Sequence, residues 1–492
     1  MRAKITPEFA STVLHYLGII LLVVGNLILL PVILAVYYGE PFLPYVIASV
    51  ISLSFGFTLF KRYQRGHLTL GRAMVLGASA FAIMALVGAA PYYMLSPQLY
   101  GGLGADAFVN SYFESMSGFT TTGLSTLPDI EAVPLSLLFW RSLTQWIGGI
   151  GVVVLFLTVM VGPGMSASYL FRGEAREERL EPSVHHTVRN MAKIYLLYTA
   201  VGALILYLLG MPLYDAINHV FTVVSTGGFS IKAVSIGAYS SVGIEIAIMA
   251  LMLVGSIPFI LHYKLLGWKW QELRGFAKSR EVQALLVIFI VFTGILALYL
   301  QGQGDPEPLR HSAFQVMSAS TTTGYATMDI ALADDFVKSV MIVLMLIGGS
   351  AGSTAGGLKI IRLLMLLSSV PWIINKFLLP KTSVLPLKVG KKVFSEEEAN
   401  QVSWYFFIYM LFIIVGTLII TAYGFSFIDS LFETTSAAAT VGLSTGITSA
   451  TAPMLIKIVL IFQMWIGRLE ILPVLVWIGA TIGSHKWSRF YN

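Results

Sequence analysis

FESMSGFTTTGLST, at residues 113–126, is the stretch that decides the fold, because the chain repeats it. Related stretches are FQVMSASTTTGYAT at residues 314–327 and FETTSAAATVGLST at residues 432–445, with a weaker copy, INHVFTVVSTGGFS, at residues 217–230. The copies share a glycine at the same position: Gly123, Gly227, Gly324 and Gly442. Successive copies lie about a hundred residues apart, longer than the roughly 20–50 residues of a solenoid repeat, which indicates four small membrane units around one axis.

The composition points to a membrane protein. The chain has 492 residues, of which 56% are hydrophobic and 11% are charged, and its mean hydropathy is +0.80. A soluble domain carries about 25% charged residues. The absence of cysteine excludes a disulfide framework and a thiolate metal site. No signal peptide is expected at the start of the chain, which runs directly into a long apolar segment.

The apolar segments predict the fold class and its division into units. Two segments, residues 14–38 and 44–60, come first, and each approaches or exceeds the ~20 residues of a spanning helix. The order helix, interrupted segment, helix then occurs four times, which predicts ten crossings. We therefore expect an all-α membrane protein with four helix–pore-loop–helix units around a pseudo-fourfold central pore. The expected divisions are two N-terminal transmembrane helices at 1–68, pore unit 1 at 69–170, a cytoplasmic loop and pore unit 2 at 171–270, pore unit 3 at 271–375, and a cytoplasmic connector with pore unit 4 at 376–492.

The charges predict the orientation in the membrane. Most of the 31 Lys and Arg residues fall in the segments that are cytoplasmic if the N-terminus is cytoplasmic, so the positive-inside rule places both termini there. The opposite segments collect acids such as Asp106, Asp129 and Asp305, which would attract a cation from outside. The net charge of +6 does not predict nucleic-acid binding, because it follows this topology. Residues 171–193 and 371–401 are expected to be inner loops, or else a docking surface for a cytoplasmic partner.

The repeated stretch predicts a cation filter. Non-helical backbone is tolerated at membrane depth only where it is buried in protein or lines a water-filled cavity. We expect a half-helix that descends partway, followed by an extended return in which glycine lets successive carbonyls point to one side. Four such returns would form rings of oxygens that replace the hydration shell of a cation. The alternative is that these Ser, Thr and Gly residues only pack helices together, but four matching copies argue against it.

These stretches resemble those of the TrkH/KtrB/HKT superfamily of potassium transporters over nearly the whole chain. The two helices before the first unit resemble TrkH/TrkG more than the shorter KtrB. The resemblance implies one filter glycine in each unit and potassium as the transported ion. The implied potassium-binding positions are Thr121, Thr122, Gly123, Ser225, Thr226, Gly227, Thr322, Thr323, Gly324, Thr440, Val441 and Gly442. In the family, serine in place of the first-unit glycine accompanies sodium preference, and this chain has Gly123.

A run of small residues, GGSAGSTAGG at residues 348–357, interrupts the second helix of unit 3. It lacks the Gly-Lys-Ser/Thr ending of a phosphate-binding loop. We expect a flexible break that lines a cavity, with a glycine-rich helix crossing as the alternative. The resemblance implies an intramembrane loop that obstructs the pore below the filter. Its candidate gate residues are Gly348, Gly349, Gly352, Gly356, Gly357 and Lys359.

Arg468 is a second gate candidate, expected about midway along a last helix at residues 455–482. An arginine there costs about 2.5–3.5 kcal/mol on insertion scales, so it should face the pore or a partner. Glu470, two residues on, points to another side of a helix. The resemblance implies a pore arginine that limits cation leakage, and a structural pairing with Glu470 or a neighbouring helix is the alternative.

No enzyme constellation is present in the sequence. The acids of the expected half-helices, Glu114, Asp215, Asp429 and Glu433, are predicted to cap those helices or to attract cations. They show no nucleophile–base arrangement, and no histidine pair has metal-ligand spacing. We therefore expect no enzymatic activity and no organic cofactor, with potassium as the transported ion.

The combined prediction is a channel-like subunit for potassium uptake in a bacterial inner membrane, embedded in lipid and without a nucleic-acid partner. The resemblance implies a homodimer on a cytoplasmic TrkA-type ring that binds nucleotides and controls the gate. The alternative is a secondary transporter that couples potassium to protons or sodium, as a symporter does. Such transporters usually have two inverted halves, whereas four like-oriented units are expected here.

Overall fold

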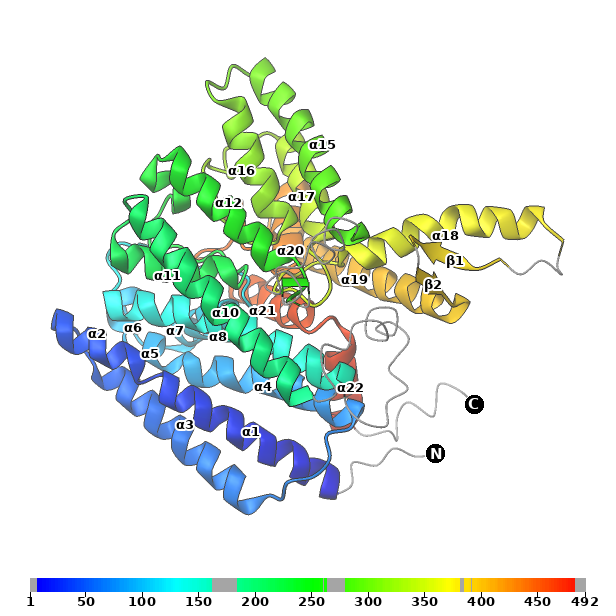
Figure 1. Ribbon diagram of the computed structural model, residues 1–492. Coiled ribbons are helices and arrows are strands. Elements are labelled where there is room, and N and C mark those ends of the chain that lie inside the picture. Colours follow the sequence, from blue (N-terminus) through cyan, green and yellow to red (C-terminus); the bar gives the residue numbers. More distant parts are fainter. Residues whose placement is uncertain are drawn as a thin grey trace.

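The computed structural model describes residues 7–161, 184–259, 261–262, 279–380, 385–390 and 392–482. Within these ranges the regular structure is helical, apart from one two-stranded hairpin (Figure 1). Helices dominate because a helix satisfies its backbone polar groups internally, as hydrocarbon requires. The chain is an all-helical membrane protein, as the sequence predicts.

Seven helical segments of the described ranges are long and apolar enough to cross a membrane. They are Pro7–Tyr38, Leu43–Arg62, Leu70–Met94, Arg189–Leu208, Arg280–Gly302, Ile360–Leu378 and Glu396–Ala422. A pair of helices, Met454–Arg468 and Leu472–Thr481, passes the same test as one span but is bent by 111°, and the shorter apolar helix Val242–Ser256 falls below the length limit. Seven or eight spans are therefore evident by length and composition, against the ten expected.

Four sets of helices repeat after the N-terminal α1 (Pro7–Leu27), α2 (Leu30–Tyr38) and α3 (Leu43–Arg62). In each set a long helix is followed by a short half-helix and then by a second helix. The first set is α4 (Leu70–Gly88) with the short α5 (Ala90–Met94) and α6 (Ser96–Leu99), half-helix α7 (Ala105–Phe119) and α8 (Leu135–Val161). The second is α10 (Val184–Leu208), half-helix α11 (Leu213–Val224), the 3-10 turn η1 (Ser235–Tyr239) and α12 (Val242–Ser256). The third is α15 (Arg280–Gly302), half-helix α16 (Pro308–Ser320), α17 (Asp335–Ile347) and α18 (Ile360–Leu378). The fourth is α19 (Glu396–Ala422), half-helix α20 (Phe427–Ala438), α21 (Met454–Arg468) and α22 (Leu472–Ile482).

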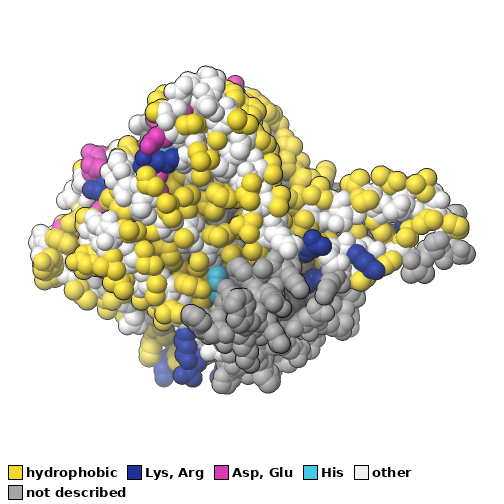
Figure 2. Space-filling model, turned by 45° about the horizontal axis from the view of Figure 1, so that its top comes forward, with side chains coloured by type: hydrophobic (Ala, Val, Ile, Leu, Met, Phe, Trp, Pro, Cys, Tyr) yellow, Lys and Arg dark blue, Asp and Glu magenta, His cyan; other side chains and the backbone are white. Residues whose placement is uncertain are grey.

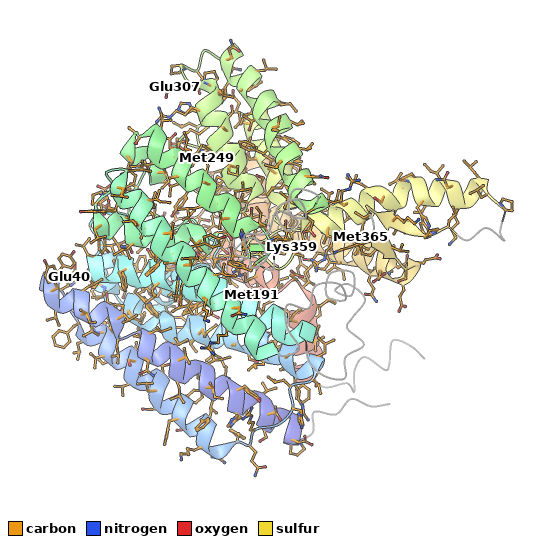
Figure 3. The ribbon with its side chains drawn as sticks, viewed as in Figure 1. Glu40, Met191, Met249, Glu307, Lys359 and Met365 are labelled. Carbon is orange, nitrogen blue, oxygen red and sulfur yellow. The ribbon has the colours of Figure 1, made fainter. Side chains whose placement is uncertain are left out.

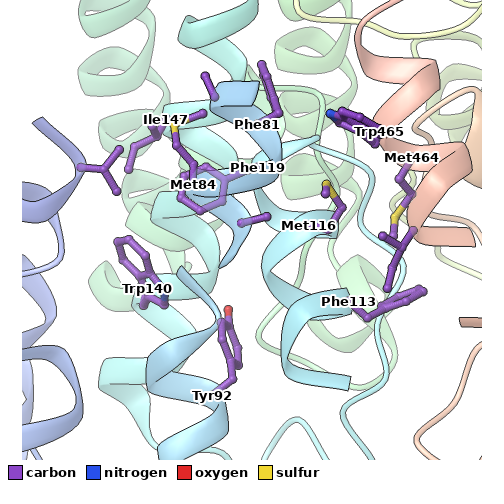
Figure 4. Close-up of a cluster of buried hydrophobic side chains, with 14 of the residues drawn as sticks. Phe81, Met84, Tyr92, Phe113, Met116, Phe119, Trp140, Ile147, Met464 and Trp465 are labelled. Carbon is purple, nitrogen blue, oxygen red and sulfur yellow. The ribbon is translucent and has the colours of Figure 1, made fainter. Parts of the chain in front are cut away.

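The first and last sets pack against each other around a large buried cluster. Phe113 and Phe119 of α7 lie in it with Trp140 of α8 and Trp465 of α21 (Figure 4). The indole of Trp140 donates to the Gly88 carbonyl over 3.1 Å, and that of Trp465 donates to the Ala78 carbonyl over 3.1 Å. Buried aromatic side chains with satisfied polar ends give large apolar burial without an unpaired donor. The two ends of the sequence are thereby joined.

Polar contacts tie each second helix to the half-helix of the following set, at the rim where the half-helices begin. We call this the outer rim. The ties are Tyr214 Oη to the Leu135 carbonyl at 2.5 Å, Arg310 to Glu245 through two bonds of 2.8 Å, Lys338 Nζ to Asp429 at 2.8 Å, and Lys457 Nζ to Asp106 at 2.7 Å. The last of these joins α21 to α7, so the four ties close into a ring. They also account for three basic residues on the side that the positive-inside rule leaves poor in them, because each is paired with a carboxylate.

The structure differs from the predicted elements in three places. The expected last helix at 455–482 is broken, because Glu470 and Ile471 adopt left-handed φ angles of 59° and 64° and Pro473 starts a new helix. Arg468 is therefore the last residue of α21 and does not lie midway along a helix. The expected connector at 371–401 contains a hairpin, β1 (Leu387–Val389) with β2 (Lys392–Phe394), whose apolar side chains pack on α18. Of the inner segment expected at 171–193, residues 171–183 lie outside the described residues and α10 begins at Val184.

Hydrophobic side chains cover most of the described surface in Figure 2. On α15, Val287, Ile290 and Leu298 are more than half exposed, although they are aliphatic. Acidic side chains gather toward one edge of the face shown in Figure 2. Some basic side chains lie beside them, and others lie at the lower edge of that face. An apolar belt between charged ends is the surface expected of a protein whose solvent is a bilayer.

Candidate functional site

Each half-helix ends in the same backbone turn. The residue after the helix is its C-cap, and the next residue has a left-handed φ of 50–54°: Thr121, Thr226, Thr322 and Thr440. Two residues later comes a glycine with a positive φ: Gly123 at 96°, Gly228 at 73°, Gly324 at 84° and Gly442 at 97°. Left-handed backbone strains an L side chain, so glycine suits the second position. We call the three residues from each threonine to its glycine a filter segment.

The second filter segment is shifted by one residue from the expected register. Thr226, Gly227 and Gly228 take the places of Thr121, Thr122 and Gly123, and Ser225 is the C-cap of α11. The backbone bonds agree, since Thr226 N donates to Val223 and Gly227 N donates to Thr222, as Thr121 and Thr122 donate to Gly118 and Ser117. In this register Ser225 lies before the second filter segment and Gly228 completes it, whereas the sequence pattern predicts Ser225, Thr226 and Gly227.

The four filter segments meet in a closed ring. A Cβ built on Gly123 would lie 2.4 Å from the Gly227 carbonyl oxygen of the next segment, and one on Gly228 would lie 1.9 Å from that of Thr323. A Cβ built on Gly324 would lie 1.8 Å from the Val441 carbonyl oxygen, and one on Gly442 would lie 2.2 Å from that of Thr122. The glycine of each segment thus faces a carbonyl of the following segment, and the glycine of the fourth faces a carbonyl of the first. No side chain larger than hydrogen fits at these glycines.

A buried polar side chain braces each returning strand from behind. These side chains lie nine residues before the glycines and are fully buried: Glu114, His219, Gln315 and Glu433. Glu114 accepts from Ser125 Oγ at 2.8 Å and from the Thr126 backbone, and Glu433 accepts from Ser444 Oγ at 2.8 Å and from Thr445 N at 3.0 Å.

The other two braces are neutral. His219 Nε2 lies 3.1 Å from Ser230 Oγ, and the Gln315 amide oxygen accepts from Thr327 N at 2.9 Å when the amide is oriented to satisfy its neighbours. The sequence singles out Glu114 and Glu433 as helix caps or cation attractors. They are instead buried braces, and the role of His219 and Gln315 was missed because neither residue type matches the acids. Asp429 is paired with Lys338 and Asp215 accepts from Tyr239 Oη at 2.7 Å, so neither is a free attractor.

The threonine hydroxyls of the filter segments form a layer at the ends of the half-helices. Thr121 Oγ1 and Thr440 Oγ1 are buried and have no hydrogen-bond partner within the described residues. Thr226 Oγ1 donates to the Ser225 carbonyl over 2.7 Å, and Thr322 Oγ1 accepts from the Gly356 backbone over 2.6 Å. Buried hydroxyls without partners are unfavourable, so this layer suits a ligand that supplies the missing interaction.

The segment from Gly348 to Lys359 is non-helical and lies directly beside this layer. We call it the intramembrane loop. Thr354 Oγ1 donates to the carbonyls of Val224 and Gly255 over 3.0 and 2.9 Å, and a Cβ on Gly356 would lie 2.2 Å from the Ala439 carbonyl. Positive φ angles at Gly348, Gly352, Gly357 and Lys359 prevent this stretch from forming a helix. The loop therefore touches the ends of three half-helices.

The guanidinium of Arg468 holds the loop from the opposite side. Its NH1 donates to the Thr354 carbonyl over 2.7 Å and its NH2 donates to the Gly148 carbonyl of α8 over 3.3 Å. The side chain is buried, and its Nε has no protein partner among the described residues. Arg468 also lies at the C-terminal end of α21, where the helix dipole favours a positive charge. Of the two structural pairings given as the alternative, these bonds do not include one with Glu470, whereas the bond to Gly148 is a contact with the neighbouring helix α8.

Glu470 has cationic partners of its own. Its carboxylate pairs with Arg362 of α18 and lies 4.0 Å from Lys359 Nζ. Lys359 also donates to the Ala355 carbonyl within the loop, and Figure 3 shows its position near the middle of the molecule. Arg362 stacks over the Tyr405 ring of α19 at 4.3 Å. These contacts join the end of the loop, the start of α18 and the break between α21 and α22.

A repeated half-helix with a closed ring of filter segments defines a class: polytopic membrane proteins built to pass small solutes. A family model described as TrkH, cation transport protein, matches residues 104–488. The chain belongs to this family. It is therefore a multi-pass membrane protein of cation transport, and the family is one of transporters and not of enzymes.

Relatives agree over nearly the whole chain. An uncharacterized cation transporter of Methanocaldococcus jannaschii is 36% identical over 96% of this chain and 96% of its own. The Trk system potassium uptake protein TrkH of Salmonella typhimurium is 29% identical over 93% of this chain and 96% of its own. The crystal structure of the potassium transporter TrkH from Vibrio parahaemolyticus shares the fold with a TM-score of 0.85, at 24% identity, covering 96% of this chain and 99% of that one.

Proposed function

We propose that this chain is the ion-conducting subunit of a potassium uptake system, and that the ring of filter segments is its selectivity filter. The observation that carries the proposal is the closed ring, in which each segment turns a carbonyl toward the glycine of the preceding segment. The potassium-binding positions are then Thr121, Thr122, Gly123, Thr226, Gly227, Gly228, Thr322, Thr323, Gly324, Thr440, Val441 and Gly442.

The chemistry of these donors favours a monovalent cation. The ring offers neutral carbonyl and hydroxyl oxygens, which replace the hydration shell of potassium. Calcium sites instead recruit several carboxylates. The carboxyl groups of Glu114 and Glu433 are engaged behind the returning segments, so they do not coordinate the ion. Potassium uptake is also what the names of the Salmonella and Vibrio relatives state for those proteins.

The intramembrane loop and Arg468 form the gate in this proposal. The loop lies against the ends of the half-helices, and Arg468 places a positive charge beside it. A fixed positive charge in a narrow, poorly hydrated passage raises the barrier for a cation. We infer that the loop must withdraw from Thr322 and Val224 before ions pass. The candidate gate residues are Gly348, Gly349, Gly352, Gly356, Gly357, Lys359 and Arg468.

The proposed setting is the bacterial inner membrane, with both termini cytoplasmic and four pore units divided as the sequence suggests. The basic residues Arg62, Arg72 and Lys376 at the ends of α3, α4 and α18 would face the cytoplasm. The acidic outer rim would face outward and concentrate cations.

The proposed partners are a second copy of this chain and a cytoplasmic TrkA-type ring that binds nucleotides. Figure 1 shows α18, the hairpin and α19 as an arm that extends from the rest of the molecule. Phe377 and Leu378 on this arm are 86% and 75% exposed. Large exposed apolar side chains on a projecting element suit an interface between two copies.

Ion flux tests the proposal. The purified chain in liposomes should pass potassium in preference to sodium, and Gly123→Ser should weaken that preference, because a Cβ there meets the Gly227 carbonyl at 2.4 Å. Gly294→Ala, where an added Cβ meets nothing within 4 Å, is the matched control. Equal passage of both ions by the unaltered chain would overturn the potassium assignment. A reversal potential that moves with pH or with sodium would instead support coupled transport.

A further inference from the structure

Gln145 of α8 holds both peptide groups that flank Gly228. Its Nε2 donates to the Gly227 carbonyl over 2.6 Å, and its Oε1 accepts from Phe229 N over 3.0 Å. The side chain is fully buried and comes from the set before the segment that it contacts. The amide thus acts on the second filter segment as a paired backbone strand would.

This contact explains why the second copy has two successive glycines. A Cβ on Gly227 would lie 2.4 Å from Gln145 Cδ, so the amide occupies the space of a side chain. The other segments have Thr122, Thr323 and Val441 at this place. In two of them the hydroxyl pairs with the C-cap threonine, Thr122 with Thr120 at 2.9 Å and Thr323 with Thr321 at 2.8 Å.

The second segment needs this support more than the others. A Gly-Gly pair has the greatest conformational freedom of the four segments, because neither residue has a side chain to fix its peptide groups. Arg141, one turn before Gln145, adds to the support: its NH1 donates to the Ser230 carbonyl over 2.8 Å, and its guanidinium lies 3.4 Å from the centre of the Phe229 ring. Three residues of the returning strand are therefore fixed by one face of α8.

We propose that Gln145 is a positioning residue that sets the cation preference of the filter by fixing the orientation of the Gly227 carbonyl. The inference rests on the proposed function of the ring as a filter. A carbonyl oxygen has two lone pairs, so Gly227 can accept from Gln145 and still face a cation. Without the amide, the peptide between Gly227 and Gly228 is free to rotate, and one of the four oxygens leaves the ring.

The test is a pair of exchanges at positions 145 and 227. In Gln145→Ala the potassium-to-sodium permeability ratio should fall about two- to twelvefold, the effect of losing a hydrogen bond worth roughly 0.5–1.5 kcal/mol. Gly227→Thr alone should abolish flux, because its side chain collides with Gln145. The double variant Gln145→Ala with Gly227→Thr places a hydroxyl near Ser225, as Thr122 lies near Thr120, and should recover the ratio to within about twofold.

Two further variants separate positioning from folding. Gln145→Glu keeps the acceptor for Phe229 and nearly the same volume but loses the donor to Gly227, so it should also lower the ratio. Ser142→Ala, which removes a buried hydroxyl that donates to the Leu138 carbonyl of its own helix over 3.1 Å, should leave the ratio unchanged.

The outcomes distinguish this inference from the proposed function. If the unaltered chain shows no potassium preference, in flux or as thermal stabilisation by KCl over NaCl, the filter proposal itself fails. If the unaltered chain prefers potassium and Gln145→Ala keeps the same ratio, the positioning role is overturned, whether or not total flux falls. If Gln145→Ala loses the potassium preference and the double variant does not recover it, the claim that a hydroxyl at position 227 can replace the Gln145 amide is overturned.

Discussion

Gly228 shows most directly how one backbone angle supports the site. Its φ of 73° is unfavourable for any L side chain, and a Cβ there would lie 1.9 Å from the Thr323 carbonyl. Relief of such a contact requires movement of two filter segments, because both contacting groups are backbone. Gly227 has no positive φ, and the atoms nearest to a Cβ built on it belong to Gln145, so its restriction comes from that contact and not from its backbone angle.

We therefore expect Gly228→Ala to abolish potassium-selective flux while the protein still inserts and folds. The measurement is uptake of potassium and sodium into liposomes, with Gly294→Ala on α15 as the control that an added methyl leaves unaffected. Unchanged selectivity in Gly228→Ala would show that the second segment does not take part in the ring.

Arg468 gives a second prediction at this scale. Arg468→Ala removes the bonds to the Thr354 and Gly148 carbonyls and the positive charge beside the loop, so basal potassium flux should rise several-fold. Arg468→Lys keeps the charge with fewer donors, so its basal potassium flux should lie between that of the unaltered chain and that of Arg468→Ala. A fall in flux with normal protein yield would identify Arg468 as a structural residue.

The sequence could predict the filter residues only in part, for a physical reason. The Thr-Thr-Gly pattern is unambiguous at Thr121–Gly123 because only one glycine is available there. In the second copy, Ser225-Thr226-Gly227-Gly228 offers two glycines, and the pattern match selects the first. The structural register follows from where α11 ends, with Ser225 as its C-cap, and the local pattern does not mark that boundary.

At the scale of elements, individual hydrogen bonds hold the intramembrane loop to α11, to α12 and to the filter segment after α16. Thr354 Oγ1 is central, since it donates to Val224 of α11 and Gly255 of α12. Backbone bonds add to this contact, from Ser350 N to the Ser256 carbonyl over 3.1 Å and from Thr354 N to the Gly255 carbonyl over 3.2 Å, so the loop is held by individual bonds and not by a continuous helix.

Thr354→Val should therefore raise basal flux, because valine keeps the shape of threonine but leaves the Val224 and Gly255 carbonyls without this donor. Ser353→Ala is the matched control, since Ser353 Oγ donates within the loop to the Ser350 carbonyl. Shortening the loop within residues 348–357 should have the same effect more strongly. If all three variants have the basal flux of the unaltered chain, the loop does not take part in gating.

Element boundaries were predictable where composition changes and not where it stays apolar. The small residues at 348–357 mark an interruption in the sequence itself. The break at Leu469–Ile471 lies inside a run that is apolar on both sides of Glu470, so hydropathy continues across it and only Pro473 hints at a new helix. The hairpin at 387–394 is too short for strand periodicity to appear.

At the scale of the whole molecule, the ties of the outer rim join units that are far apart in the chain. Lys457 is buried, whereas the Asp106 side chain is 62% exposed. Asp106→Asn should therefore destabilise the protein by about 3 kcal/mol, because it leaves a buried ammonium without its counter-charge. Lys457→Met should cost less, since the remaining carboxylate is hydrated. Thermal unfolding in detergent compares the two, and the reverse order would contradict this account of the pair.

The arm of α18 and α19 gives the prediction for assembly. Phe377→Glu with Leu378→Glu should convert a dimer to a monomer, measured by light scattering in detergent, because two exposed apolar side chains become charged. Leu332→Glu, at a position 84% exposed in a loop beside the outer rim, is the control and should not change the mass. A dimer that survives both exchanges would place the interface elsewhere.

The four ties of the outer rim form a closed ring that joins the helices at one end of the molecule. Helices that are joined at one end can move apart only at the other end. The bound end here carries Lys457, Lys338, Arg310 and Tyr214, whereas the far end carries the loop, Arg468 and the bent joint before α22. If the proposed function holds, such a molecule would keep the geometry of its entrance constant while its exit widens, so ion recognition and flow control could change independently.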